Sequence, residues 1–159
     1  MSIPSRLSDY LEQRGTQYEI CAHELSRTSA ETARSAHIQA HQLAKSVLLE
    51  DDAGCVVAVL PADQSILVSE VNQILGRKDL KLSNENRIAQ LFGDCDRGAI
   101  PAVGMAWGLD TIVDDDLSNN DTVYLEGGDH ERLLQMTREQ FQQLMGDQLH
   151  GRFCKPTLH

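Results

Sequence analysis

One lysine stands in a segment that is otherwise mostly apolar. Lys45 lies within Leu43-Ala-Lys-Ser-Val-Leu-Leu49, which predicts a buried strand. Strand alternation places Lys45 on the same face as Leu43, Val47 and Leu49. Lysine is depleted in strands and is seldom fully buried without a partner. Two explanations stay open: an ammonium group that reaches water from an edge strand, or a cation at the floor of a pocket, aimed at a phosphate or a carbonyl oxygen.

A glycine-rich segment follows later in the chain. It reads Gly93-Asp-Cys-Asp-Arg-Gly-Ala-Ile-Pro-Ala-Val-Gly104 and holds three glycines and one proline. Glycine lets backbone approach a ligand closely, and proline fixes its own φ angle. The composition predicts a loop of defined shape that presents N–H and C=O groups to a reacting ester. As an isolated feature, a tight connection between a helix and a strand explains the segment better.

The cysteines offer a competing chemistry. Cys95 lies in the glycine-rich segment beside Arg97, whose charge would lower the pKa of the thiol. A nucleophilic thiol also needs a nearby histidine base, which the sequence does not reveal. Cys21, Cys55, Cys95 and Cys154 are widely spaced and form no Cys-x-x-Cys pair, so a zinc ribbon or a redox pair is not expected.

Metal and cofactor sites are not predicted. His37 and His41 have the i, i+4 spacing of helical metal ligands, but no glutamate follows His37 and no third ligand is evident. The acidic runs 51–52 and 114–116 are interpreted as hydrated turns.

Composition limits the class of protein. The chain has 159 residues, 41% hydrophobic and 24% charged, which suits one globular domain. A membrane span would need about 18 consecutive apolar residues, and the N-terminus lacks the apolar core of a signal peptide, so we expect a cytoplasmic protein. A net charge of −10 and only four lysines argue against coating of nucleic acid backbones. A small footprint on the end of an RNA stays compatible with this charge.

The pattern of apolar and turn residues predicts an α+β domain around a single mixed sheet. Helices are expected over about 4–14, 28–40, 65–75, 84–92 and 137–145, with Thr28, Ser83 and Thr137 as caps. Strands are expected over 17–20, 43–49, 55–60, 80–82, 111–113, 122–125 and 132–135, the second and third forming a hairpin. Residues 146–159 are interpreted as a polar tail that either frays or is pinned by Phe153 and Leu158.

Lys45 and the glycine-rich segment together resemble the YbaK and prolyl-tRNA-synthetase-associated family of aminoacyl-tRNA deacylases. The matching motifs are Ala44-Lys45-Ser46-Val47, Gly93 with Gly98-Ala99-Ile100-Pro101-Ala102-Val103-Gly104, and Ile112-Val113-Asp114. The resemblance covers nearly the whole chain and implies one domain over 1–159, with a partly barrel-like mixed sheet surrounded by helices. The second proline of the family loop is Ala102 here, which bears on amino-acid specificity.

The resemblance implies hydrolysis, in trans, of the ester that joins a wrong amino acid to tRNA, without a cofactor. Lys45 would bind the terminal phosphate or orient the ester. Backbone groups around Gly98 would place the water and stabilise the oxyanion, and a ribose hydroxyl would assist proton transfer. The substrate contacts that the resemblance implies are Ser46, Ala99, Ile100, Pro101, Gly104 and His130. His130 is equally explained as a surface histidine in a turn.

The expected partner is the acceptor end of an aminoacyl-tRNA, with no DNA and no membrane. Either a small basic patch of Lys45, Arg27 and Arg97 suffices for this contact, or a synthetase or elongation factor presents the tRNA. Two other functions are weighed. One is a catalytically inactive module of the same fold that binds an aminoacyl-type ligand or a partner protein, which the acidic charge and Ala102 favour. The other is a thiol-dependent hydrolase that uses Cys95.

Overall fold

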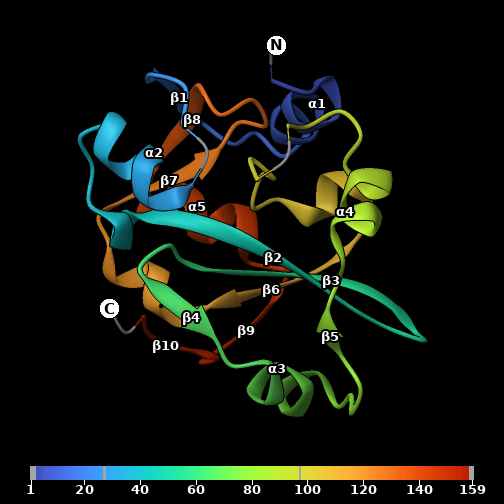
Figure 1. The fold of residues 1–159 in the computed structure, drawn as a ribbon. Coiled ribbons are helices and arrows are strands. Elements are labelled where there is room, and N and C mark those ends of the chain that lie inside the picture. Colours follow the sequence, from blue (N-terminus) through green and yellow to red (C-terminus); the bar gives the residue numbers. More distant parts are fainter. Residues whose placement is uncertain (1–2, 27, 97, 158–159) are drawn as a thin grey trace.

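The computed structural model describes residues 3–26, 28–96 and 98–157, and within these ranges the chain has a mixed α/β fold (Figure 1). The α-helices are α1 (Ser5–Gln13), α2 (Ser29–Ser35), α3 (Val68–Leu75), α4 (Glu85–Leu91) and α5 (Arg138–Met145). The strands are β1 (Glu19–Ala22), β2 (Leu43–Asp51), β3 (Gly54–Pro61), β4 (Gln64–Ile66), β5 (Lys81–Leu82), β6 (Asp110–Asp114), β7 (Thr122–Glu126), β8 (Arg132–Thr137), β9 (Leu149–Gly151) and β10 (Cys154–Pro156). Short 3-10 helices are η1 (Ala40–Gln42), η2 (Gly104–Trp107) and η3 (Asp115–Asn119). None of the described helices is long and apolar enough to cross a membrane.

Polar side chains cap the first turns of α2, α4 and α5. The capping oxygens belong to Thr28, Asn84 and Thr137, and each accepts a backbone N–H three residues later. The predicted caps Thr28 and Thr137 are confirmed. The predicted cap Ser83 is wrong, because Asn84 takes the N-cap position one residue later.

Two helices are shorter than their periodicity predicts. Helix α2 ends at Ser35 instead of near residue 40, because His37 takes a left-handed backbone conformation with φ of 59°. Helix α3 begins at Val68 instead of residue 65, because residues 64–66 form β4 and pair with β10. His37 therefore lies outside any helix and His41 lies in η1, so the helical i, i+4 pair considered from the sequence does not form.

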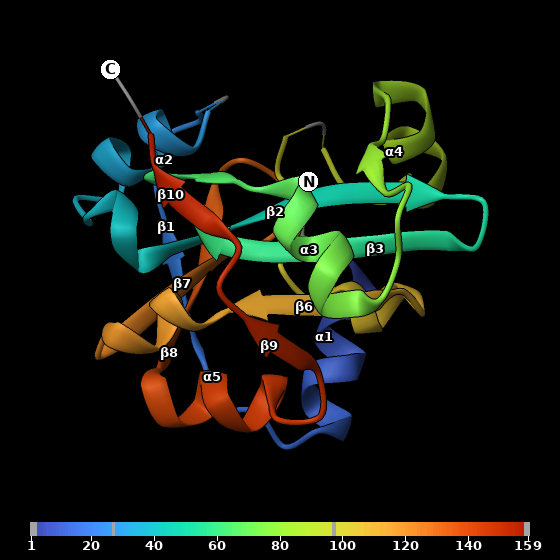
Figure 2. The same ribbon diagram turned by 90° about the horizontal axis from the view of Figure 1, so that it is seen from below.

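The main sheet is mixed, as predicted. Its strand order is β1-β8-β7-β2-β3-β6-β9, and β5 adds to one edge of β2. The β2–β3 hairpin is antiparallel, whereas β2–β7, β3–β6 and β6–β9 are parallel. The sheet is open, because β1 and β9 lie at its two ends (Figure 2). A separate pair, β4 with β10, was not expected.

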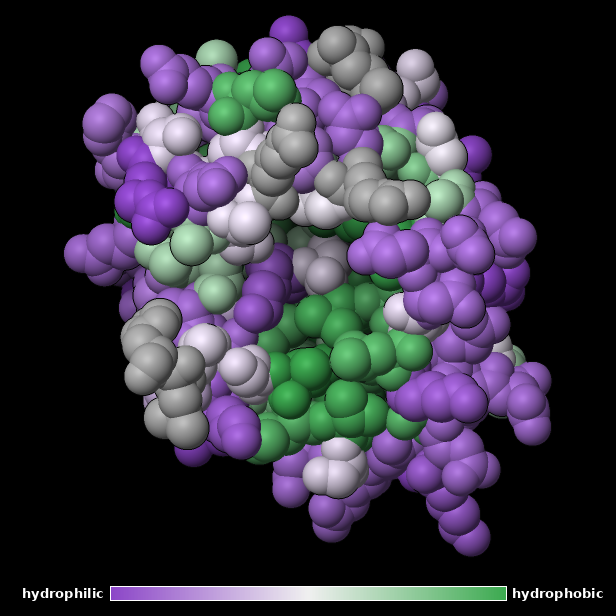
Figure 3. All heavy atoms as spheres, in the orientation of Figure 1, coloured by the Kyte–Doolittle hydropathy of each residue, from purple (hydrophilic) through white to green (hydrophobic). Residues whose placement is uncertain are grey.

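The two faces of the sheet bury different apolar clusters. On one face, Leu49, Val56, Ala58 and Leu60 pack with Val71 of α3 and with Phe153. Partly buried members of this cluster include Val47, Ile66 and Val68. Figure 3 shows an apolar patch below the middle of β2. We call this side of the sheet the α3 face.

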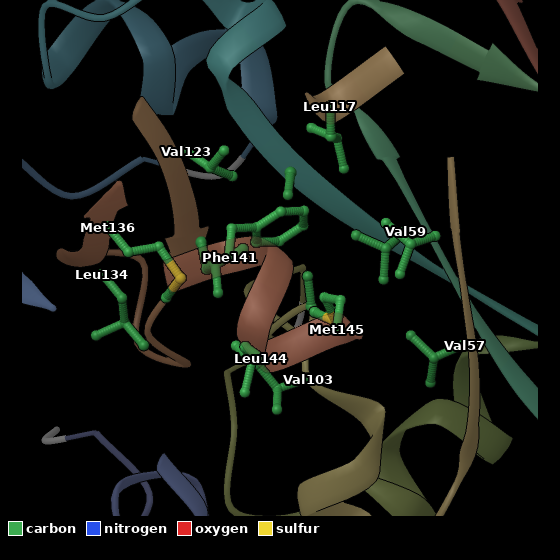
Figure 4. Close-up of a cluster of buried hydrophobic side chains, with 14 of the residues drawn as sticks. Val57, Val59, Val103, Leu117, Val123, Leu134, Met136, Phe141, Leu144 and Met145 are labelled. Atoms are coloured by element: carbon green, nitrogen blue, oxygen red, sulfur yellow. The ribbon is translucent and has the colours of Figure 1, made fainter. Parts of the chain in front are cut away.

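The opposite face carries the larger cluster. Side chains of α1 and α5, among them Leu11 and Phe141, pack there against Ala44, Leu48 and Val59 of the hairpin. Figure 4 shows Phe141, Leu144 and Met145 of α5 pointing toward the side chains of the sheet. We call this side the α5 face, so that alternate residues of β2 belong to alternate faces.

The C-terminal segment is not a polar tail of little structure, and this expectation is corrected. Leu149–Gly151 forms β9 beside β6, and Cys154–Pro156 forms β10 beside β4. Phe153 between them is fully buried, which matches the alternative in which Phe153 pins the segment. Leu158 lies outside the described residues.

Candidate active site

Strand β2 has an open stretch on one of its edges. Strand β7 pairs there only with Leu43 and Ala44, and β5 pairs only with Leu49 and Glu50. No described strand pairs with residues 45–48 on this edge. The Leu48 carbonyl faces the same edge, because it accepts the N–H of Ser83 at 3.0 Å. By alternation the peptide groups of Ser46 also point toward this edge, where they have no sheet partner in the described chain.

The glycine loop lies against this open stretch. The Ser46 hydroxyl donates a 3.0 Å hydrogen bond to the carbonyl oxygen of Ile100. Ser46 leaves β2 toward the α5 face, and Ile100 packs against the cluster on that face. Most of the rest of the loop, from Ala99 to Gly104, is buried. The loop therefore borders the open edge from the α5 face.

Two glycines set the path of the loop. Gly98 has a φ of 83°, a left-handed conformation that favours glycine. A Cβ atom at Gly104 would lie 2.6 Å from Thr111 Oγ1 and 2.7 Å from Val57 Cγ2, so no side chain fits there. The loop is further tied by the N–H of Asp96, which donates to the carbonyl of Gly128 at 2.7 Å. A loop of defined shape follows from these constraints.

Lys45 borders the same edge from the opposite side. It belongs to the α3 face and is half-buried, and this burial lowers the pKa of its ammonium, while Asp63 and Cys154 act in the other direction. Within the described residues the ammonium makes no hydrogen bond or ion pair. The open edge of β2 thus runs between Lys45 and the loop, and Figure 3 shows a hollow over the middle of β2. The structure does not bring Lys45 and Ile100 to one face, but it places them on the two sides of one opening.

Two acidic side chains lie level with Lys45 on the α3 face. Glu126 follows Leu125, which pairs in parallel with Ala44, so Glu126 is level with Lys45 on the neighbouring strand. Asp114 is likewise level with Leu60, the antiparallel partner of Lys45. Residues in register on adjacent strands point to the same face. A row of Glu126, Lys45, Leu60 and Asp114 therefore crosses four strands.

Glu126 was not predicted from the sequence as a residue of this site. This residue is only 4% exposed, and the pKa of its carboxyl is raised to about 7. Burial is the main cause and the charge of Asp129 adds to it, whereas a hydrogen bond from Thr32 lowers the pKa. A charged residue at the end of an apolar strand, Thr122-Val-Tyr-Leu-Glu126, was the available signal. It is a weak signal, because most such residues lie at the surface.

His130 is buried, so its interpretation as a surface histidine is wrong. It is 8% exposed and has a φ of 62° in the turn between β7 and β8. The neighbouring Asp129 fixes this turn by accepting the N–H groups of Glu131 and Arg132 and by pairing with the Arg132 guanidinium. The carbonyl of His130 accepts the N–H of Ser26, so this turn supports the segment before α2.

Cys95 does not have the environment of a nucleophile. Burial and the carboxylates of Asp94 and Asp96 raise the pKa of its thiol to about 12, and among the described residues Arg6 acts in the other direction. The predicted neighbour Arg97 lies outside the described residues, as does Arg27 of the expected basic patch. The thiol is therefore protonated at neutral pH, which removes the basis for a Cys95 hydrolase.

Asp114, Asp116 and Cys154 place potential metal ligands within 4.8 Å of one another. The Asp114 carboxylate already accepts the N–H groups of Asp116 at 2.9 Å and Phe153 at 2.8 Å. Burial raises the pKa of Cys154 to about 12, whereas a metal ligand must be a thiolate. The group is better explained as the contact that holds the C-terminal segment against β6.

Comparison with solved structures shows the class of fold. The hypothetical protein APE2540 superposes with a TM-score of 0.83 at 22% identity, over 95% of this chain and 100% of that chain. A candidate trans-editing enzyme for prolyl tRNA synthetase gives 0.81 at 21% identity, over 94% and 95%. A candidate signal transduction protein from Marinobacter aquaeolei VT8 gives 0.74 at 23% identity, over 95% of this chain but 30% of that chain. No curated protein matched the sequence. The fold is thus that of the YbaK-like trans-editing proteins.

The family follows from the sequence. Residues 23–144 match the model of the aminoacyl-tRNA editing domain, and the chain belongs to this family. The matched range contains Lys45, the glycine loop, Glu126 and His130. Helix α1 and the C-terminal strands β9 and β10 lie outside it.

Proposed function

We propose that this protein hydrolyses the ester bond of mischarged tRNA in trans, in the cytoplasm, as a step of translation quality control. The observation that carries the proposal is the open edge of β2, bordered by Lys45 on one side and by the loop 98–104 on the other. Membership of the aminoacyl-tRNA editing family supplies the substrate class.

Hydrolysis of an aminoacyl ester needs little catalytic assistance from the protein, because this ester is already activated toward attack by water. A water held in the right place suffices if the developing oxyanion is stabilised. The unpaired peptide groups of Ser46 and the backbone of Gly98, Ala99 and Ile100 are the donors and acceptors available at this edge. The Lys45 ammonium would hold the terminal phosphate or the ester, and a ribose hydroxyl would assist the proton transfer.

The remaining contacts follow from the surroundings of the edge. Pro101 and Gly104 are buried parts of the loop, and the turn at His130 holds the segment before α2 through the N–H of Ser26. The acceptor end of the tRNA is the expected ligand. A net charge of −10 disfavours a wide RNA footprint, so presentation by a synthetase or elongation factor fits this chain better than a basic patch.

A panel of mischarged tRNAs tests the proposal. We expect wild-type protein to deacylate at least one of them, and Lys45→Met to lose roughly 10²-fold or more in kcat/KM. Lys45→Arg tests whether any cation suffices, and Lys155→Met, at an exposed lysine, is the matched control. Thermal unfolding confirms that each variant folds. Hydrolysis of none of the substrates, where a family relative is active, would reject the proposal.

A second candidate is a non-catalytic module that recognises an aminoacyl-type ligand or a partner protein. It is favoured by the same fold forming 30% of a longer chain described as a candidate signal transduction protein. In that case the protein binds an uncleavable aminoacyl-adenosine but turns over no ester, and Lys45→Met weakens binding only.

A further inference from the structure

Glu126 has a carboxylate oxygen without a partner. Its Oε2 atom is buried and makes no hydrogen bond within the described part of the chain. Leaving a buried carboxylate oxygen unsatisfied costs free energy, and such groups are rare in folded proteins. An unsatisfied acceptor beside a candidate site is therefore evidence of a missing donor.

Among the described residues, three polar side chains near Glu126 are already engaged. Thr32 of α2 donates to the Glu126 carboxyl, and Ser26 lies 2.6 Å from the Thr32 hydroxyl. Since Thr32 has one proton, Ser26 must be the donor of the contact between them. The nearby Asp129 is paired with Arg132 and with two backbone N–H groups. Burial lowers the pKa of the Lys45 ammonium, and the charges of Asp63 and Cys154, rather than that of Glu126, act in the other direction.

The position of Glu126 matches one end of the open edge. It is the last residue of β7, at the level where β7 leaves β2, and it shares the α3 face with Lys45. The last paired residues, Ala44 and Leu125, directly precede Lys45 and Glu126, so the two strands begin to separate at this level. A ligand along the edge of β2 would have Lys45 near one part and Glu126 near another.

We propose that Glu126 Oε2 accepts a hydrogen bond from the α-ammonium group of the amino acid esterified to tRNA. This inference rests on the proposed function, and it assigns a subsite for the free amino group beside Lys45. The aminoacylated end of a tRNA carries a phosphate on its terminal nucleotide and an ammonium group on the attached amino acid. These two charges match the Lys45 ammonium and the Glu126 carboxylate on one face of the sheet. The carboxyl is enclosed in the free protein, so the Ser26 and Thr32 side chains must move aside when the ligand enters.

Binding of uncleavable ligands tests the inference without turnover. The probes are the L-alanyl and L-lactoyl amides of 3′-amino-3′-deoxyadenosine, which differ only in an ammonium against a hydroxyl. We expect wild-type protein to bind the alanyl probe about 10- to 100-fold more tightly, as a charged hydrogen bond predicts. In Glu126→Gln this preference should vanish while the affinity for the lactoyl probe is kept. Glu131→Gln, at an exposed glutamate, is the matched control and should keep the preference.

Each remaining outcome overturns the inference. Wild-type protein that binds the probes equally, or binds neither, has no ammonium subsite, and this comparison does not depend on the folding of a variant. A Glu126→Gln protein that keeps the preference places the subsite elsewhere. Hydrolysis is scored separately on mischarged tRNA: a preserved preference without hydrolysis would reject the proposed function and leave the subsite standing.

Discussion

The hydroxyl of Ser46 donates a 3.0 Å hydrogen bond to the carbonyl oxygen of Ile100, and this contact ties strand β2 to the glycine loop. The two residues are far apart in the sequence, yet the contact holds the loop against the strand. Lys45, the preceding residue, leaves β2 on the opposite face. Neighbouring residues of β2 thus have different roles: Ser46 contacts the loop, and Lys45 presents a cation on the opposite face.

Replacing Ser46 tests the importance of this tie. We expect Ser46→Ala to lower the free energy of unfolding by about 1 kcal/mol and to reduce deacylation several-fold, because the Ile100 carbonyl loses its donor. Ser46→Thr keeps the hydroxyl, and a cavity of about 30 Å³ beside Ser46 has space for the added methyl group. Denaturant unfolding and kcat/KM measure the two effects. Equal activity in the Ala and wild-type proteins would show that the tie does not position the loop.

Glu126 should make stability depend on pH. Its pKa is raised from 4.5 to about 7, so the folded protein binds more protons than the unfolded chain between these values. The free energy of unfolding therefore falls as pH rises from about 4.5 to about 7, by an amount on the order of 3 kcal/mol. Glu126→Gln mimics the protonated carboxyl, so it should be more stable than wild type at pH 8 and equal to it near pH 4.5. Urea unfolding at both pH values measures this, and parallel pH profiles for the two proteins would contradict it.

Cys95 should be dispensable for chemistry. Because burial and two carboxylates keep its thiol protonated, Cys95→Ser is expected to retain deacylation within about twofold, and Cys95 of the wild-type protein is expected to resist iodoacetamide at pH 7.5. Kinetics and mass spectrometry of the treated protein check both points. Rapid alkylation with loss of activity would restore the thiol hydrolase as a candidate.

The C-terminal strands should be essential for stability. Phe153 is fully buried between α3 and the sheet, so Phe153→Ala is expected to lower the free energy of unfolding by about 3–5 kcal/mol. Leu149→Ala, at a residue 56% exposed in the same segment, should change it by less than about 0.5 kcal/mol. A small effect at Phe153 would mean that the segment is only loosely attached.

Local features were predictable because their causes lie within a few residues. Thr28 and Thr137 mark helix starts through side-chain caps, and the alternation of β2 places Lys45 opposite Ser46. The start of α3 and the strand character of residues 149–156 were not predictable. Both depend on pairing with segments distant in the sequence, which leave no periodic pattern in residues 64–66 or 149–156.

The sequence by itself determined that a lysine interrupts an apolar strand and that a glycine loop of defined shape follows, because residue type and spacing control those properties locally. Only the tertiary structure decided that β7 leaves β2 beside Lys45, since strand order is set by packing of the whole chain. That arrangement opens the edge of β2, places Ile100 on Ser46 and brings the buried carboxyl of Glu126 level with the lysine.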